Sequence, residues 1–368
     1  MQNYLSTIVG QKRAVDALNK FIISGNIPHS LLFTGTRNVG QHFVAKQFLK
    51  ELLRGKIPDK NFNSQIDKLE EPFIKYILPL FKGKSELSDD LPFVKYNEDE
   101  IAIFKSEFEK KINNPFHEVS FESAVSIKIS TIREIKKNLN YSYEDLPYRL
   151  VLIEDAHLMG DESQNALLKS LEEPPRGVIF ILITENQNLL LPTIKSRCWE
   201  VPFSPLQDNE VDTILENNFK IDFAVRKKII PFAEGSIHKI FEILSLDFDK
   251  LLETSIDIIR NSMGRKYNVA IKLFASSIEA NPKSLFPMVL QLIINWINDV
   301  QKLKIGVKDI HCLGHEEAME KFIKKFSLVR LDEVVCELTS LNKNIDYNIN
   351  LNLIMLNVIF SLSAIAKR

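Results

Sequence analysis

The chain has 368 residues, of which 45% are hydrophobic; this length exceeds what one hydrophobic core usually supports, so two or three domains are expected. Lys and Arg number 47 against 48 Asp and Glu, which gives a formal net charge of −1. A nearly neutral chain does not coat nucleic acid by bulk electrostatics, so any DNA contact should be local.

The three cysteines are widely separated, at Cys198, Cys312 and Cys336. They form no CxxC pair, so neither a disulfide framework nor a zinc site is predicted. The first residues, MQNYLSTIVGQKRAVD, lack a basic segment followed by an apolar segment and a cleavage site. Secretion is therefore not expected, and the cytoplasm is the predicted location.

Short apolar runs alternate with amphipathic helical patterns from residue 8 to about residue 201. The runs are SLLFTG at 30–35, RLVLIEDAH at 149–157 and VIFILIT at 178–184. This alternation predicts an α/β fold, with a parallel sheet covered by helices. Residues 56–118 are charged and interrupted by five prolines, and we expect them to be an elaboration outside the core.

Only helical patterns follow this region. The predicted domains are 1–202, a small helical lid at 203–247, and an all-helical domain at 248–368. Two apolar stretches, 285–300 and 349–365, carry polar residues at intervals. They fall short of a membrane-spanning run, so we expect buried helices of a bundle.

Residues 35–42, GTRNVGQH, keep the glycine spacing of a phosphate-binding loop but lack its lysine. In GxxxxGK[ST], backbone N–H groups cradle phosphates, the lysine neutralises their charge and the hydroxyl ligates magnesium. Gly35 and Gly40 stand in register after an apolar run, but Gln41 replaces the lysine and His42 the hydroxyl residue. Hydrolysis at this loop is not expected.

A pair of acids, Glu154 and Asp155, ends the second apolar run. It resembles the Walker-B strand, whose acids hold magnesium and orient water. The usual Asp-Glu order is reversed, and an octahedral magnesium site tolerates the changed reach poorly. The alternative is a water-exposed acid pair at a strand end. The nearby His157 is expected to form local hydrogen bonds.

Three further motifs carry a family resemblance: Ile8-Val9-Gly10-Gln11, NALLKSLEEPP at 165–175, and Ser196-Arg197-Cys198. In order and spacing they resemble the AAA+ module of bacterial clamp-loader subunits, the gamma/tau and delta-prime subunits of DNA polymerase III. The resemblance covers residues 4 to 245. It implies an AAA+ fold and lid, and a C-terminal collar through which subunits oligomerise.

The chain departs from the ATPase subunits of that family at three places. Gln41 replaces the lysine, Glu154 and Asp155 are reversed, and His238 stands where the ATPases carry the arginine of the lid. These departures favour delta-prime, the subunit that does not hydrolyse ATP. No cysteine lies in 54–122, where the family often has a zinc module. No cofactor is therefore expected, and ATP would be bound by partner subunits.

The resemblance assigns Arg197, with Ser196, as an arginine finger acting in trans on the γ-phosphate bound by a neighbouring subunit. Such a finger stabilises charge that develops on the transferring phosphoryl group. The alternative is a surface arginine paired with an acid such as Glu200. Thr184 takes the position of the family's polar sensor, and Cys198 is expected to pack as a small apolar side chain.

The resemblance implies an accessory subunit of the DNA polymerase III holoenzyme that supports ATP-driven loading of the sliding clamp on primed DNA. Expected partners are the gamma/tau ATPase and delta subunits and, indirectly, the sliding clamp and primer-template DNA, with no membrane. Lys169 either contacts a DNA phosphate or is solvated. Two other functions stay open: an active gamma-type AAA+ ATPase, and an AAA+-like scaffold unrelated to replication.

Overall fold

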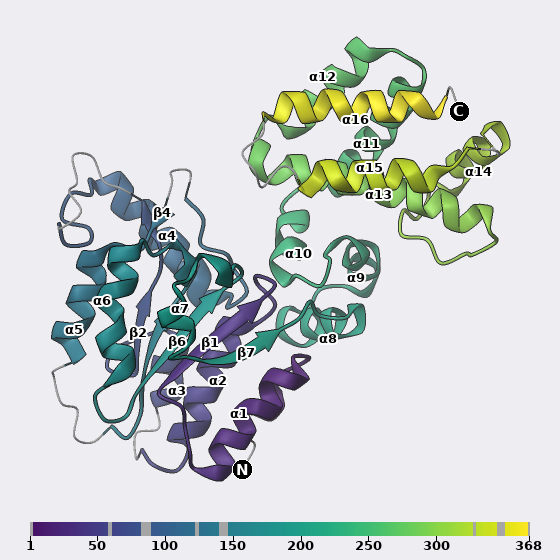
Figure 1. Ribbon diagram of the computed structural model, residues 1–368. Coiled ribbons are helices and arrows are strands. Elements are labelled where there is room, and N and C mark those ends of the chain that lie inside the picture. The colour runs from purple at the N-terminus through teal and green to yellow at the C-terminus, as the bar shows by residue number, and fades with distance from the viewer. Residues whose placement is uncertain are drawn as a thin grey trace. The chain divides into compact units, whose positions relative to one another are not determined.

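The computed structural model describes residues 3–57, 61–81, 90–121, 125–139, 146–326, 329–343 and 350–366. The chain forms two compact units (Figure 1). One consists of Met1–Ile214 with Gly235–His238, and the other of Leu215–Glu234 with Lys239–Arg368. Within the described ranges, no helix combines the length and the apolar character that crossing a membrane requires.

The first unit contains a five-stranded sheet, a two-stranded sheet and the helices around them. The strands are β1 (Ser30–Gly35), β2 (Ile74–Ile77), β5 (Arg149–Ile153), β6 (Val178–Thr184) and β7 (Trp199–Phe203), with β3 (Leu80–Phe81) and β4 (Val125–Ser126) as the small pair. The helices are α1 (Lys12–Ser24), α2 (Gln41–Leu53), α3 (Phe62–Asp67), α4 (Glu98–Asn113), α5 (Ile129–Leu139), α6 (Asp161–Glu172) and α7 (Pro192–Lys195).

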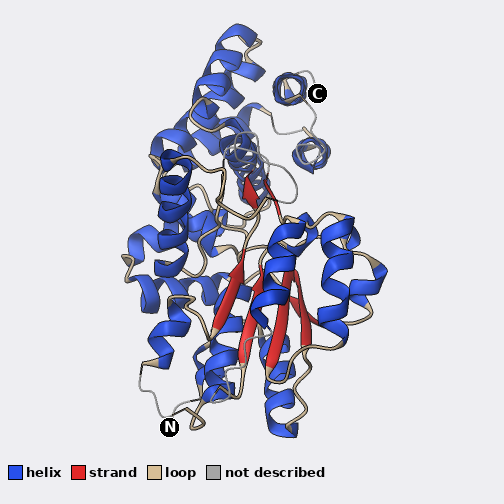
Figure 2. Ribbon diagram, turned by 90° about the vertical axis from the view of Figure 1, so that its left-hand side faces the viewer, coloured by secondary structure: helices blue, strands red, loops and turns tan. Residues whose placement is uncertain are grey.

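The five-stranded sheet is parallel throughout, with the order β2-β5-β6-β1-β7. Figure 2 shows these strands side by side with helices along them. Parallel strands end at the same edge of a sheet, so the segments that follow β1, β5 and β6 meet there. The residues that directly precede each strand lie at the opposite, amino edge.

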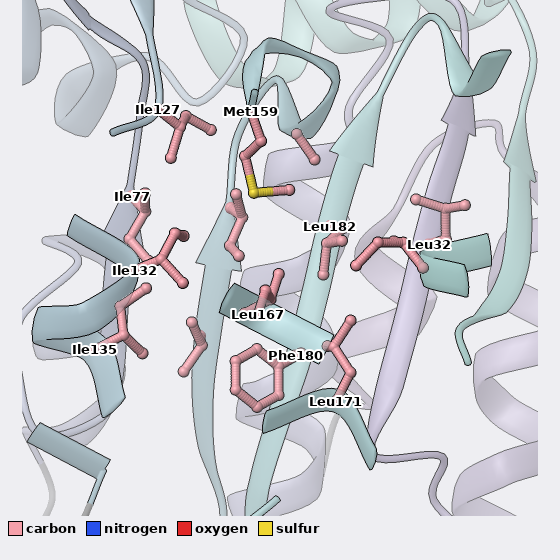
Figure 3. Packing of buried hydrophobic residues seen from close by; sticks show 14 of the residues in the cluster. Leu32, Ile77, Ile127, Ile132, Ile135, Met159, Leu167, Leu171, Phe180 and Leu182 are labelled. Atoms are coloured by element: carbon pink, nitrogen blue, oxygen red, sulfur yellow. The ribbon is translucent and has the colours of Figure 1, made fainter. Parts of the chain in front are cut away.

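The core lies against both faces of this sheet, because successive strand residues point to opposite sides. On one face, α5 and α6 cover an apolar cluster drawn in part in Figure 3. That cluster includes Leu32, Ile132, Ile135, Val151, Leu167, Leu171, Phe180 and Leu182. On the other face, Leu31, Phe33 and Ile181 are completely buried. Each such side chain contributes about 1.5–3 kcal/mol by leaving water.

The prediction that residues 56–118 form an elaboration outside the core is wrong for β2. Ile74 and Ile77 of β2 are buried, and the strand pairs with β5 in the main sheet. A four-residue strand between Pro72 and Pro79 gives too short a pattern to be recognised from sequence. Residues 58–60 and 82–89 of this segment lie outside the described residues.

The second unit is helical in all its described elements. Its longest helix, α13, packs against α11 and α15, and α16 packs against α11 and α15. The helices beyond the sheet are α8 (Asp208–Phe219) and α10 (Ile237–Leu244), each shared between the units, and α9 (Phe223–Ile229), α11 (Phe248–Met263), α12 (Tyr267–Ile278), α13 (Pro282–Lys304), α14 (Glu316–Lys325), α15 (Leu331–Lys343) and α16 (Leu351–Ile365).

The predicted fold class is confirmed: a parallel sheet with flanking helices is followed by an all-helical region. The apolar stretch at 285–300 falls in α13, and residues 351–365 of the other stretch form α16; both helices are buried against neighbouring helices. The prediction of bundle helices is therefore also confirmed.

Candidate functional site

The phosphate-loop segment joins β1 to α2 at the carboxyl edge of the sheet. Gly35 ends β1, Gly40 is the residue before α2, and Gln41 and His42 open that helix. Glu154 and Asp155 directly follow β5, and Thr184 ends β6. The sheet topology thus brings the loop and the acid pair together, as the parallel arrangement predicts.

Both loop glycines are required by the backbone of this chain itself. Gly35 has φ +125°, and a Cβ there would lie 2.0 Å from the carbonyl oxygen of Phe203 in β7. Gly40 has φ +109°, and a Cβ would lie 3.4 Å from the ring of Phe116. Side chains rarely adopt such φ values. The glycine spacing therefore has a structural cause that needs no bound phosphate.

Gln41 is buried, and its side chain bonds the loop that it follows. Its Nε2 donates to the carbonyl oxygen of Thr36 at 2.5 Å, and its Oε1 accepts from the backbone N–H of Val39 at 3.2 Å. In a working phosphate loop, N–H groups of this segment point at the ligand. In this chain the neutral amide of Gln41 occupies one of these groups, the N–H of Val39, and it provides no positive charge for a phosphate.

Glu154 accepts three hydrogen bonds inside the unit. Its carboxylate lies 3.1 Å from Nδ1 of His42, 2.9 Å from the hydroxyl of Tyr76 and 3.4 Å from Nζ of Lys111. Lys111, from the last turn of α4, also donates to the carbonyl oxygen of His117 at 2.9 Å. The side chains of Lys111 and His42 are each only 2% exposed.

The protonation states follow from this packing. Burial opposes the charge on Glu154, but Lys111 and His42 outweigh it and hold the pKa of Glu154 well below its usual range. Burial, reinforced by Lys111, lowers the pKa of His42 to about 3, so its ring is neutral near pH 7. Because a carboxylate only accepts, Nδ1 of His42 carries the proton. Its Nε2 has no hydrogen-bond partner among the described residues.

Arg37 lies inside the phosphate-loop segment and pairs with the other carboxylates at this edge of the sheet. Its guanidinium lies 2.5 Å from Asp155 and 2.7 Å from Glu118, with Glu185 at 4.0 Å. Burial opposes its charge, but these carboxylates, led by Asp155, raise the pKa of Arg37 further. Burial raises the pKa of Asp155 to about 6, although Arg37 opposes that shift.

The side chains at the other predicted positions also form hydrogen bonds within the chain. His238 accepts from the backbone N–H of Glu118 at 3.3 Å. Thr184 lies 3.2 Å from Nδ1 of His157, which confirms local hydrogen bonding by that histidine. Burial lowers the pKa of His157 to about 4. Sequence reasoning missed Lys111, Tyr76 and the role of Arg37, and only Arg37 stood inside a motif that could have signalled it.

Arg197 lies at the other edge of the sheet. It precedes β7, whose Trp199 pairs with Leu31 and whose Phe203 pairs with Gly35 at the carboxyl edge. About six strand residues, roughly 20 Å, therefore separate Arg197 from the chain's own phosphate loop. Its Nε donates to Glu172 at 2.7 Å and its Nη1 to the carbonyl oxygen of Thr193 at 2.9 Å.

Arg197 is paired with an acid, as in the alternative given above, but that acid is Glu172 and not Glu200. Glu200 instead accepts from the hydroxyl of Thr34 at 2.8 Å, across the β1–β7 pair. Ser196 donates to the carbonyl oxygen of Thr193 at 3.2 Å. Cys198 packs against the apolar cluster beneath, as predicted, and burial raises the pKa of its thiol to about 12.

No group of three or more His, Cys, Asp or Glu side chains in the described part of the chain is arranged to hold a metal ion. Lys169 is exposed on α6. Two expectations stay predictions: that the chain binds no cofactor, and that Lys169 either contacts a DNA phosphate or is solvated.

Residues 10–207 match the sequence model of a protein family described as DNA polymerase III, delta subunit. DNA polymerase III subunit gamma of Buchnera aphidicola subsp. Schizaphis graminum is 29% identical over 266 residues, which cover 70% of this chain and 60% of that protein. Subunit tau of Escherichia coli K12 is 26% identical over 210 residues, 57% of this chain and 27% of that protein. The chain thus spans less than two thirds of these relatives.

Among solved structures, a gamma subunit-related protein of Thermotoga maritima aligns over 97% of this chain and 100% of its own, at 18% identity and a TM-score of 0.40.

Proposed function

The chain belongs to the DNA polymerase III, delta subunit family, and from this premise we propose that it is the non-hydrolysing delta-prime subunit of a clamp loader. In this role it supports ATP-driven loading of the sliding clamp on primed DNA during replication. Its partners are gamma/tau-type ATPase subunits and the delta subunit, and through them the clamp and the primer-template DNA. It binds no cofactor of its own.

The observation that carries this proposal is the internal bonding at the phosphate loop. Gln41 bonds the loop backbone, Glu154 accepts from three side chains, and Asp155 is paired with Arg37. Magnesium prefers free carboxylate oxygens, and triphosphate prefers free N–H groups and a lysine. The residues present do not fit a magnesium-bound triphosphate.

The second support is the location of Arg197. An arginine at the amino edge cannot reach a phosphate at the carboxyl edge of the same sheet, because about six strand residues intervene. It is partly exposed, at 32% of its side chain. We propose that Arg197, with Ser196 beside it, acts in trans on the γ-phosphate held by a neighbouring ATPase subunit. There it stabilises the charge of the transferring phosphoryl group.

One observation favours a second candidate, an active gamma-type ATPase: the relatives reported above are gamma and tau subunits. The two functions differ in what the isolated chain does. A gamma-type subunit turns over ATP when purified alone, whereas a delta-prime subunit does not. Turnover that disappears in a Glu154→Gln variant would establish the second function.

The test of the proposed function uses the full chain in complex with the ATPase and delta subunits. The other ATPase sites are inactivated through their phosphate-loop lysines, so that DNA-stimulated hydrolysis reports the site next to this chain. Arg197→Ala should lower that rate by about 10³-fold or more, the usual worth of an arginine finger. Lys195→Ala, two residues away, is the matched control and should leave the rate unchanged. Equal rates for Arg197→Ala and wild type would refute the finger.

A further inference from the structure

Glu172, the last residue of α6, holds the guanidinium of Arg197 from the side. One of its carboxylate oxygens accepts from Nε of Arg197 at 2.7 Å and also pairs with Nη2. The carbonyl oxygen of Thr193 accepts a hydrogen bond from Nη1 at 2.9 Å. The plane of the guanidinium is therefore fixed by two elements that are distant in sequence, α6 and α7.

The base of the same side chain is also fixed. The backbone N–H of Arg197 donates to the carbonyl oxygen of Ile194 at 3.1 Å. Ile194 is completely buried, and Cys198 packs against the apolar cluster under the sheet. Pro174 and Pro175 end α6 directly after the Glu172–Glu173 pair, which holds the helix end in place. Arg197 is thus restrained at both ends.

Two N–H groups of Arg197 are left over. A guanidinium has five N–H groups, and the contacts with Glu172 and Thr193 use three of them. The remaining two, one on each Nη, form the end of the guanidinium fork. The part of the chain that the structure describes provides no acceptor for them. A fork of this geometry matches two oxygens of one phosphate group.

We infer that Glu172 is a positioning residue, which presents the free end of the Arg197 fork to two phosphate oxygens of the neighbouring subunit's nucleotide. The inference rests on the proposed function, because it needs Arg197 to act in trans. A side chain with four rotatable bonds loses much rotamer freedom when it binds. Glu172 fixes those rotamers in advance, so that Arg197 loses less rotamer freedom when the transition state forms.

The contact is well suited to this role because it does little for folding. The side chains of Arg197 and Glu172 are 32% and 45% exposed. Exposed ion pairs contribute little to stability. Loss of the Glu172 carboxylate should therefore disorder the arginine without unfolding the chain.

The test compares Glu172→Gln with Glu173→Gln in the same reconstituted complex, with the neighbouring site as the single competent ATPase site. Both variants remove one negative charge from the end of α6, but only Glu172 contacts Arg197. Glu172→Gln should lower kcat about tenfold and leave KM for ATP nearly unchanged. Glu173→Gln should match wild type. Equal kcat in the two variants, or a higher kcat for Glu172→Gln, would overturn the inference.

A double variant separates this inference from the proposed function. If Glu172 acts through Arg197, adding Glu172→Gln to Arg197→Ala changes nothing further. If the double variant is slower than Arg197→Ala, Glu172 acts by another route and the inference is wrong. If Arg197→Ala alone keeps the wild-type rate, the arginine finger itself fails. Thermal unfolding of each variant, expected to equal wild type, excludes a folding defect.

Discussion

Two arginines of the first unit have nearly the same exposed side-chain fraction, 33% for Arg37 and 32% for Arg197, but different surroundings. Arg37 lies at the carboxyl edge of the sheet among three carboxylates. Arg197 lies at the amino edge beside one, which is itself 45% exposed. The charge of Arg37 is thus balanced within the chain, whereas the fork of Arg197 is still available to another molecule.

The comparison teaches that the exposed fraction of the side chain alone does not distinguish the two arginines. The number of carboxylates around each guanidinium, three for Arg37 and one for Arg197, separates the two residues more clearly. At the carboxyl edge the polar atoms of Gln41 and Glu154 also bond other groups of the chain. The predictions below test this difference, beginning with the largest effect.

Removal of Lys111 should cause the largest loss of stability. Lys111→Met leaves the Glu154 carboxylate without its buried cation, which costs about 3–5 kcal/mol in the free energy of unfolding. The matched control, Lys110→Met, removes an exposed lysine paired with Glu107 and should cost under about 1 kcal/mol. Urea unfolding in a Trp296→Phe background, followed by the fluorescence of Trp199, reports the first unit. Equal losses in the two variants would show that Glu154 does not depend on Lys111.

The same substitution at the two arginines tests the comparison directly. Arg37→Met leaves Asp155 and Glu118 facing each other without their shared cation, and should cost about 1–3 kcal/mol. Arg197→Met should cost about 0.5 kcal/mol or less. The same urea titration measures both. A larger loss for Arg197→Met would reverse the assignment of structural and functional roles.

The buried neutral His42 should give stability a pH dependence. Its pKa is about 3 in the folded chain and 6.5 as an ordinary histidine. As pH falls from 6.5 toward 3, the unfolded chain takes up a proton that the folded chain does not, so stability is lost, at up to about 1.4 kcal/mol per pH unit.

His42→Asn keeps an amide donor for Glu154 but does not titrate, so its stability should fall less steeply over this range. Unfolding free energies measured between pH 6.5 and about pH 5.5 avoid the region where Glu154 itself contributes, because its own loss begins about one pH unit above its ordinary pKa of 4.5. His157 and Asp155, whose pKa values are also shifted, are present in both proteins and cancel. Identical slopes for wild type and His42→Asn would mean that His42 is charged in the folded chain.

Sequence patterns predicted β1, β5 and β6, the loop between β1 and α2, and the acid pair Glu154 and Asp155 at the end of β5. These features depend on local apolar runs and on the rule that parallel strands end together. Lys111 and Tyr76 could not be predicted, because they lie 43 and 78 residues from Glu154 and come from a segment without a recognisable motif.

The acid paired with Arg197 is another contact that the sequence does not identify, for a related reason. Glu200 is close in sequence, but it accepts a hydrogen bond from Thr34 on the neighbouring strand. Glu172 is 25 residues away and is brought to Arg197 by the packing of α6. Sequence distance therefore favoured the wrong acid, and only the tertiary arrangement identifies the right one.

Isothermal titration of the purified full-length chain with magnesium and ATP tests the central claim most directly. The claim is that this chain has satisfied its own phosphate loop and acts on the nucleotide of a neighbour. The account predicts no binding heat at millimolar ATP and no turnover. Binding with a micromolar Kd, together with release of phosphate by the chain alone, would contradict it.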